Sequence, residues 1–225
     1  MLDKMLSGLS SENITNLPPE LYYEIGYIYV QQGALDRAIE EYDQAIKLNP
    51  NYAEALINRG RAFGLKGEYD RAIQDFDQAI KLNPNYAEAY NNRGATYGLK
   101  GQSDRAIKDF DQAIKLNPNY AQAFIGRGSA YHRKGQYDRA IKDFDQAIKL
   151  KPDYADALNN RGNAYFEKRD YDRAIQDFDQ AIKLNPIYFA AFNNRGNAYH
   201  HKGQYNRAIE DYDHAITLSV RILIV

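Results

Sequence analysis

Cysteine is absent from the 225-residue sequence, and an excess of either charge is nearly absent as well. Without cysteine, neither disulfide bonds nor thiol chemistry can contribute to the fold or the function. The 29 Lys and Arg residues almost balance the 30 Asp and Glu residues, so the formal net charge is -1. This balance, with Lys and Asp alternating along several segments, argues against nucleic acid or a membrane surface as the main partner.

Long hydrophobic runs are also lacking near the start of the sequence. Polar residues, among them Asp3, Lys4, Ser7, Ser10, Ser11 and Glu12, interrupt residues 1–17. This segment therefore does not resemble a secretory signal, and we expect a cytoplasmic protein. We interpret residues 1–18 as an N-terminal leader. It is either partly disordered or forms a short capping helix through Leu2, Met5, Leu6 and Leu9.

Proline is scarce, but its placement is regular. Of the seven prolines, five lie 34 residues apart: Pro50, Pro84, Pro118, Pro152 and Pro186. A fixed period of this length indicates stacked two-helix units rather than a single globular core. In such a stack the stability is spread over contacts between neighbouring units.

Each unit is predicted to be a pair of helices. In residues 83–89, Asn85 is the expected N-cap and Glu88 completes a capping box, so the first helix should start near Tyr86. Glycines such as Gly101 and Gly135 should end the first helices. In the second helix, residues 172–184, an apolar stripe is typical of a helix buried along one face: Ala174, Ile175, Phe178, Ala181 and Ile182.

These spacings resemble the tetratricopeptide repeat, whose aromatic or Leu, Gly, Tyr, Ala, Phe and Pro positions match Tyr90, Gly94, Tyr97, Ala106, Phe110 and Pro118. The resemblance implies an all-α, right-handed α-solenoid superhelix of six 34-residue helix-turn-helix repeats. The repeats would span residues 19–52, 53–86, 87–120, 121–154, 155–188 and 189–222, followed by an apolar tail at residues 223–225.

One departure from the family pattern is systematic. Where the family has Leu before the Gly, this sequence has Arg59, Arg93, Arg127, Arg161 and Arg195. We expect the aliphatic part of each Arg to pack between units while its guanidinium reaches a carboxylate or a carbonyl.

The resemblance also places the first helices on a concave inner surface, where asparagines recur. A carboxamide both donates and accepts, so one Asn can pair with the N-H and C=O of an extended peptide. The ladder is similar to that in the superhelix of the O-linked N-acetylglucosamine transferases. We predict a peptide-binding site of Asn58, Asn91, Asn92, Asn159, Asn160, Asn163, Asn193, Asn194 and Asn197, interrupted by a gap or shallow apolar spot at Ile125 and Gly126. The alternative is that Asn is merely tolerated there.

Other activities find less support in the sequence. A carboxylate clamp of the co-chaperone type needs basic residues where Glu54, Glu88, Gln122 and Asp156 stand. His132 and His200 recur two repeats apart, but no carboxylate cluster completes a metal site. We expect Asp77 to pair with Lys81, and Asp111 with Lys115, on a solvated convex face. We therefore predict no catalytic residues, no metal and no cofactor.

The sequence favours a non-enzymatic scaffold that binds a protein or peptide in its groove. The alternative is a self-assembling module, because no polar closing helix follows Leu218. An exposed apolar patch of this kind marks a contact site, and a two-fold homodimer is the simplest assembly. The residues predicted for self-association are Ile209, Ile216, Ile222, Leu223, Ile224 and Val225.

Overall fold

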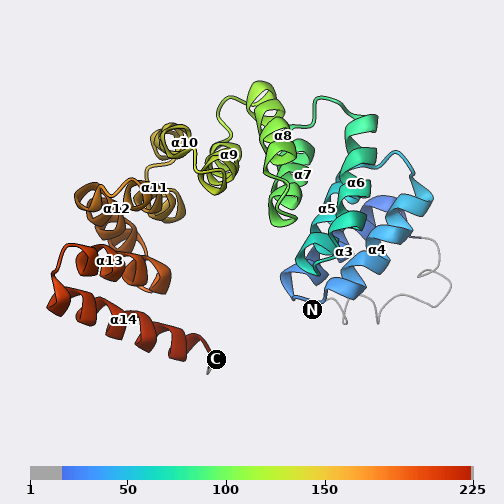
Figure 1. Ribbon diagram of the computed structural model, residues 1–225. Coiled ribbons are helices and arrows are strands. Elements are labelled where there is room, and N and C mark those ends of the chain that lie inside the picture. The colour runs from blue at the N-terminus through green and yellow to red at the C-terminus, as the bar shows by residue number, and fades with distance from the viewer. Residues whose placement is uncertain (1–16, 224–225) are drawn as a thin grey trace. The chain divides into compact units, whose positions relative to one another are not determined.

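The computed structural model describes residues 17–223, and these residues form twelve helices and no strand (Figure 1). The prediction of an all-α solenoid of helix pairs is confirmed. The helices are α3 (Pro19–Gln31), α4 (Leu35–Leu48), α5 (Ala53–Leu65), α6 (Tyr69–Leu82), α7 (Ala87–Leu99), α8 (Ser103–Leu116), α9 (Ala121–Arg133), α10 (Tyr137–Leu150), α11 (Ala155–Glu167), α12 (Tyr171–Leu184), α13 (Phe189–His201) and α14 (Tyr205–Leu223).

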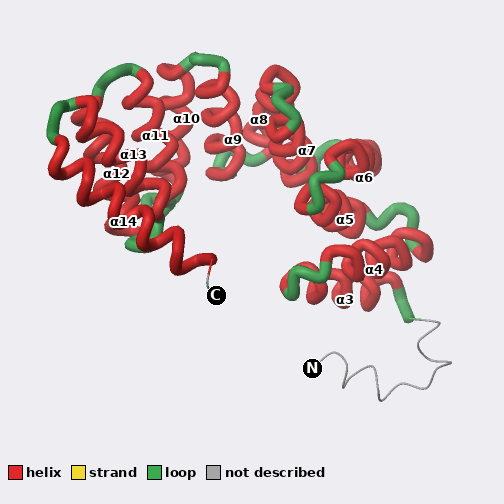
Figure 2. Tube along the Cα trace, turned by 60° about the horizontal axis from the view of Figure 1, so that its bottom comes forward, coloured by secondary structure: helices red, strands yellow, loops and turns green. Residues whose placement is uncertain are grey.

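The chain divides into two compact units, the first ending at Lys100 and the second beginning at Gly101. The first unit contains α3 to α7, and the second contains α8 to α14. Within each unit the helices stack in chain order, joined by the short loops seen in Figure 2. In this order a first helix packs against its own second helix and against the second helix of the preceding repeat.

The turns within the helix pairs depend on backbone with positive φ. Gly101, Gly135 and Gly203 have φ of 74°, 70° and 74°, a conformation that glycine adopts without steric cost. They end the first helices as predicted. The turn before α12 uses Arg169 instead, with φ of 61°, which is rare for a residue with a side chain.

The predicted capping box is wrong. Helix α7 begins at Ala87 with Tyr86 as its N-cap residue, and no side chain caps it. The side chain that organises this turn belongs to Asn83, whose Oδ1 accepts a hydrogen bond from the backbone N-H of Asn85 at 3.1 Å. An asparagine that bonds two residues ahead stabilises a turn rather than a helix start.

Close packing within a pair relies on a glycine that faces an aromatic ring. A Cβ atom on Gly162 would lie 2.6 Å from Cε1 of Phe178, and one on Gly128 would lie 2.7 Å from Cε1 of Phe144. Both rings are almost fully buried. The absent side chain therefore lets the two helix backbones approach closely.

The arginines that depart from the family pattern reach carboxylates, as predicted, and Arg161 binds one on each side. Arg161 donates from Nε and Nη2 to the buried Asp177 at 2.8 and 2.6 Å, and from Nη1 to Asp145 at 2.6 Å. These bonds raise the pKa of Arg161 above its ordinary value. Each such arginine connects its own repeat to the preceding one.

The predicted Asp77–Lys81 and Asp111–Lys115 pairs are wrong. Asp77 accepts from Arg93 at 2.5 Å, and Asp111 accepts from Arg127 at 2.6 Å. The planar guanidinium of the following repeat reaches these carboxylates with good geometry. The lysines that do form bridges lie at the ends of first helices, as in the pair of Lys168 with Asp138.

Candidate functional site

The first helices of each unit lie on the inner side of the stack. In the second unit α11 contacts both α9 and α13, whereas α10, α12 and α14 make no comparable contacts with one another. In the first unit α5 likewise contacts α3 and α7. Because the first helices approach one another and the second helices spread apart, each stack curves with its first helices inside.

Two small adjoining cavities lie on this inner side in the second unit. One has a volume of about 210 Å³ and is lined by His132, Asn163, Phe166, Glu167, Asn194 and Asn197. The other has a volume of about 170 Å³ and is lined by Ser129, His132, Arg133, Phe144, Asn160 and Asn163. The two cavities share His132 and Asn163, so they form one elongated site across α9, α11 and α13.

His132 stands between the two cavities. Its ring lies edge-on to Tyr137, with ring centroids 5.3 Å apart, and its Nε2 is buried without a hydrogen-bond partner among the described residues. Burial lowers the pKa of His132, and the nearby Glu167 carboxylate opposes that shift. The imidazole is therefore mainly neutral at neutral pH, when one ring nitrogen can donate and the other can accept.

Four of the predicted asparagines line these cavities: Asn160, Asn163, Asn194 and Asn197. They lie on α11 and α13 and are half-buried. Asn197 also accepts a hydrogen bond from the hydroxyl of Tyr212 through Oδ1, at 2.9 Å, which fixes the orientation of its carboxamide. Its NH₂ group then points away from that bond and can donate to another molecule.

Other asparagines form hydrogen bonds within the protein. Asn159 is only 5% exposed, and its Oδ1 accepts from Nδ2 of Asn194 at 3.0 Å. Its burial removes Asn159 from the set that could contact a ligand. Asn193, one residue before Asn194, is exposed and lines neither cavity.

The three predicted asparagines of the first unit, Asn58, Asn91 and Asn92, differ in their hydrogen bonding. Asn58 donates from Nδ2 to the Tyr23 hydroxyl at 2.8 Å. Asn91 donates to Oδ1 of Asn92 at 3.3 Å, whereas Nδ2 of Asn92 is buried without a partner among the described residues. Asn194 donates to Asn159, the residue 35 positions before it, but the residue at that distance before Asn92 is Ile57, whose side chain has no acceptor.

The gap or shallow apolar spot expected at Ile125 and Gly126 stays a prediction, since both residues are half-buried. A Cβ atom on Gly126 would lie 2.3 Å from Cζ of Phe110, so that ring occupies the space. Ile125 packs at the edge of two core clusters, one around Phe124 and one around Phe144. These two residues therefore border the core and remain partly exposed.

Sequence reasoning missed several residues of the site. Ser129, Arg133, Phe166 and Glu167 line it, although no motif singled them out. From the sequence alone, His132 was considered only as a metal ligand. The sequence does contain a signal for this part of the site, because the equivalent positions 132, 166 and 200, 34 residues apart, all hold a ring side chain: His, Phe and His.

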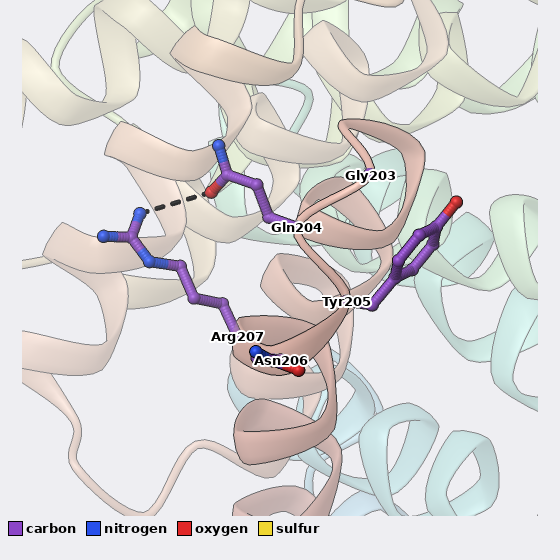
Figure 3. A pocket seen from close by; sticks show the side chains of 5 residues that line it. All are labelled: Gly203, Gln204, Tyr205, Asn206 and Arg207. Carbon is purple, nitrogen blue, oxygen red and sulfur yellow. Dashed lines mark hydrogen bonds between the residues drawn. The ribbon is translucent and has the colours of Figure 1, made fainter.

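Other hollows in the second unit lie at turns and are open. Figure 3 shows the one between α13 and α14, lined by Gly203, Gln204, Tyr205, Asn206 and Arg207, where Arg207 donates to Oε1 of Gln204 at 3.2 Å. Similar hollows occur at the turns of residues 101–105 and 135–139. They are lined mainly by residues consecutive in the sequence at a single turn, so they are weaker candidates for a ligand site.

Residues 17–223 offer neither a metal site nor a membrane span. They contain no cluster of three or more His, Cys, Asp or Glu side chains that could hold a metal ion. None of the described helices combines the length and the apolarity needed to cross a membrane.

Family models match almost the whole helical region. A model described as TPR repeat matches residues 26–67, 60–101 and 128–168, and a tetratricopeptide repeat model matches residues 87–120, 155–188 and 189–219. The chain belongs to the tetratricopeptide repeat family. A further tetratricopeptide repeat model matches residues 110–142. Among curated proteins, the search found no match.

Solved structures of other tetratricopeptide repeat proteins are similar to this chain. A MamA protein is 30% identical, with a TM-score of 0.63 over 75% of this chain and 92% of the other. MamA from Desulfovibrio magneticus RS-1 is 25% identical, with a TM-score of 0.66 over 76% and 96%. YrrB, described as a TPR protein with an unusual peptide-binding site, is 25% identical, with a TM-score of 0.59 over 76% and 88%.

Proposed function

We propose that this protein is a non-enzymatic scaffold that binds an extended segment of a partner protein on the inner side of its second unit. The observation that supports the proposal best is the elongated site shared by α9, α11 and α13. Its carboxamides come from Asn160, Asn163, Asn194 and Asn197. The solved structure of YrrB, a TPR protein with a peptide-binding site, adds support from a relative.

The chemistry of the site suits a peptide backbone. Each carboxamide offers a donor and an acceptor, so it can pair with the N-H and the C=O of an extended chain without selecting a side chain. The cavities are small, so a side chain of modest size fits each of them. Phe166 contributes an apolar wall, while Arg133 and Glu167 contribute one charge of each sign. The partner segment should therefore be mixed in composition rather than strongly acidic or basic.

The experiment uses peptides selected from a random library displayed on phage, because the natural partner is unidentified. Selected peptides are synthesised with a fluorophore, and their affinity is measured by fluorescence polarisation. In the test variant, Asn160, Asn163, Asn194 and Asn197 are all replaced by Ala. We expect affinity to fall by at least about tenfold, since each lost hydrogen bond contributes about 1 kcal/mol.

The matched control removes carboxamides from the opposite side. Gln44, Gln78 and Gln180 are exposed on second helices, and their replacement by Ala should leave affinity unchanged. N-methylation of alternate backbone nitrogens in the peptide should also weaken binding if the asparagines pair with the backbone. Equal affinity of the test variant and the wild-type chain, with circular dichroism unchanged, would refute the proposal.

A further inference from the structure

The outward face of α14 carries four exposed apolar side chains along one stripe. Tyr205, Ile209, Ile216 and Val220 are 60%, 57%, 61% and 48% exposed. The stripe includes two of the residues predicted to mediate self-association. Of the others, Ile222 and Leu223 belong to α14 without described side chains, and Ile224 and Val225 lie outside the described residues.

The rest of the chain shows what covers such a stripe. Ile175 and Ile182 of α12 are equivalent to Ile209 and Ile216, 34 residues earlier. Ile175 packs at a cluster that includes Ala198 of α13, and Ile182 packs at one that includes Ala191 of α13. Each of these isoleucines therefore packs in a cluster that an alanine of the following first helix joins, and the small size of alanine lets the helices approach closely.

An acidic residue in the same stripe also lacks its expected partner. Asp213 lies between Ile209 and Ile216 on this face, four and three residues away. Each of its five equivalents accepts a bond from the arginine of the following first helix: Asp43, Asp77, Asp111, Asp145 and Asp179. Asp213 is exposed and forms no ion pair among the described residues.

Helix α14 keeps only one of the two acidic residues that bind the following repeat elsewhere in the chain. In earlier repeats a second acidic residue binds a lysine of the following repeat, as Asp172 binds Lys202. The equivalent position in α14 holds Asn206, so that acceptor charge is gone. Helix α14 thus keeps the carboxylate that receives an arginine and lacks the one that receives a lysine.

We propose that the face of α14 binds an α-helix of a partner protein that presents the pattern Ala-x₃-Arg-x₂-Ala. The two alanines would lie on Ile209 and Ile216, and the arginine would bind Asp213. This pattern occurs in α13 as Ala191, Arg195 and Ala198, and it is the complement that α12 already receives. The proposal is independent of the inner site, because it concerns the opposite helix of the last pair.

Two other occupants fit the face less well. Helix α3 of a second copy has Leu21, Ile25 and Ile28 at the equivalent positions, so it is too bulky and has no arginine. Pairing α14 with α14 of a second copy across a two-fold axis would place two Asp213 carboxylates in one apolar interface. Like charges in a desolvated contact are unfavourable.

The test uses a fluorescent peptide with the sequence of residues 187–203, which contains α13. A hydrocarbon bridge between positions 193 and 197, on the side away from the three matching residues, keeps it helical, because short isolated helices are marginal in water. Binding to the full chain is measured by fluorescence polarisation. We expect saturable binding that weakens by about tenfold or more when the peptide carries R195E, since the salt bridge becomes a repulsion.

Charge reversal on the protein sharpens the test. The D213R chain should lose the original peptide and bind the R195E peptide, which a merely unfolded variant would not do. The I216E chain should bind neither. As the matched control, Ile187 is 66% exposed in the turn before α13, and I187E should bind as well as the wild-type chain.

Three outcomes would overturn the proposal. One is the absence of binding at millimolar peptide with the circular dichroism unchanged. Another is binding that is insensitive to D213R and I216E. The last is a wild-type chain that sediments as a dimer at micromolar concentration while the I209E/I216E chain sediments as a monomer, since a second copy would then occupy the face.

Discussion

The inner faces of the two units differ although their helix pairs are built alike. At the three equivalent positions near the ends of the first helices, the first unit has Arg61, Gly64 and Leu65 in α5, and Ala95, Gly98 and Leu99 in α7. The second unit has Ser129, His132 and Arg133 in α9, Asn163, Phe166 and Glu167 in α11, and Asn197, His200 and His201 in α13. Leu65 and Leu99 are 68% and 66% exposed.

The scaffold and the site therefore use separate positions of the repeat. The aromatic ring, the glycine beneath it and the arginine recur in both units, as in Phe76 with Gly60 and Phe144 with Gly128. The positions that vary are those that face the inner side. A repeat protein can therefore change what it binds without changing how it folds.

The largest expected effect tests whether the scaffold is the same in both units. Phe76→Ala in the first unit and Phe144→Ala in the second should each lower the free energy of unfolding by about 3–5 kcal/mol, because each ring is 1% exposed. Urea unfolding followed by circular dichroism measures both. If one variant lost less than about 1 kcal/mol while the other lost the full amount, the two scaffolds would not be equivalent.

A smaller effect separates scaffold positions from inner-face positions. Gly162→Ala should cost about 1–3 kcal/mol, because its new methyl group would overlap the ring of Phe178. Gly64→Ala should instead stabilise the chain by about 0.5–1 kcal/mol, since no atom lies within 4 Å of the new Cβ. Thermal melting of the two variants gives the comparison. A loss of stability in Gly64→Ala would show that this inner position is constrained.

The smallest effect concerns His132, which stands in the second unit at the position equivalent to Gly64. Burial lowers the pKa of the folded imidazole below that of the unfolded chain. Below the unfolded pKa of about 6.5, the unfolded state binds more protons, so stability falls as the pH falls. The Glu167 carboxylate partly opposes this loss and Arg133 adds to it.

We expect the melting temperature of the wild-type chain to fall between pH 7.5 and pH 5.5 by up to about 2 °C more than that of His132→Gln. Replacement by Gln removes the titrating group and keeps a polar side chain. His201→Gln provides a control at an exposed histidine. Parallel melting curves for wild type and His132→Gln would mean that the burial of His132 does not affect its titration.

Much of the scaffold was predictable from the sequence. Three local patterns recur along the chain: the 34-residue period, the apolar stripe of the second helix and the arginine. Because they recur in several repeats, they cannot be mistaken for a chance match in one repeat. The binding of Arg161 to carboxylates followed from its chemistry. Its two particular partners could not be foreseen, because Asp145 and Asp177 are adjacent only once the helices stack.

The site was less predictable, because the sequence does not distinguish an asparagine that bonds within the protein interior from one that lines a surface cavity. Asn159 and Asn160 are neighbours in the sequence, yet one bonds to Asn194 in the interior and the other lines a cavity. One step along a helix turns a side chain by about 100°, which separates the two roles. The capping box was wrong because Asn85 belongs to the turn that Asn83 closes, and Tyr86 takes the N-cap position one residue later.

The paired contacts of the arginines have a consequence for how the second unit comes apart. Arg127 joins α8 to α10, Arg161 joins α10 to α12, and Arg195 joins α12 to α14 through their aspartates. If one repeat frays, a neighbouring guanidinium or a buried carboxylate loses its counter-charge, which is costly. The boundary between folded and unfolded repeats is thus penalised, and the unit should melt with long-range cooperativity instead of peeling one helix pair at a time.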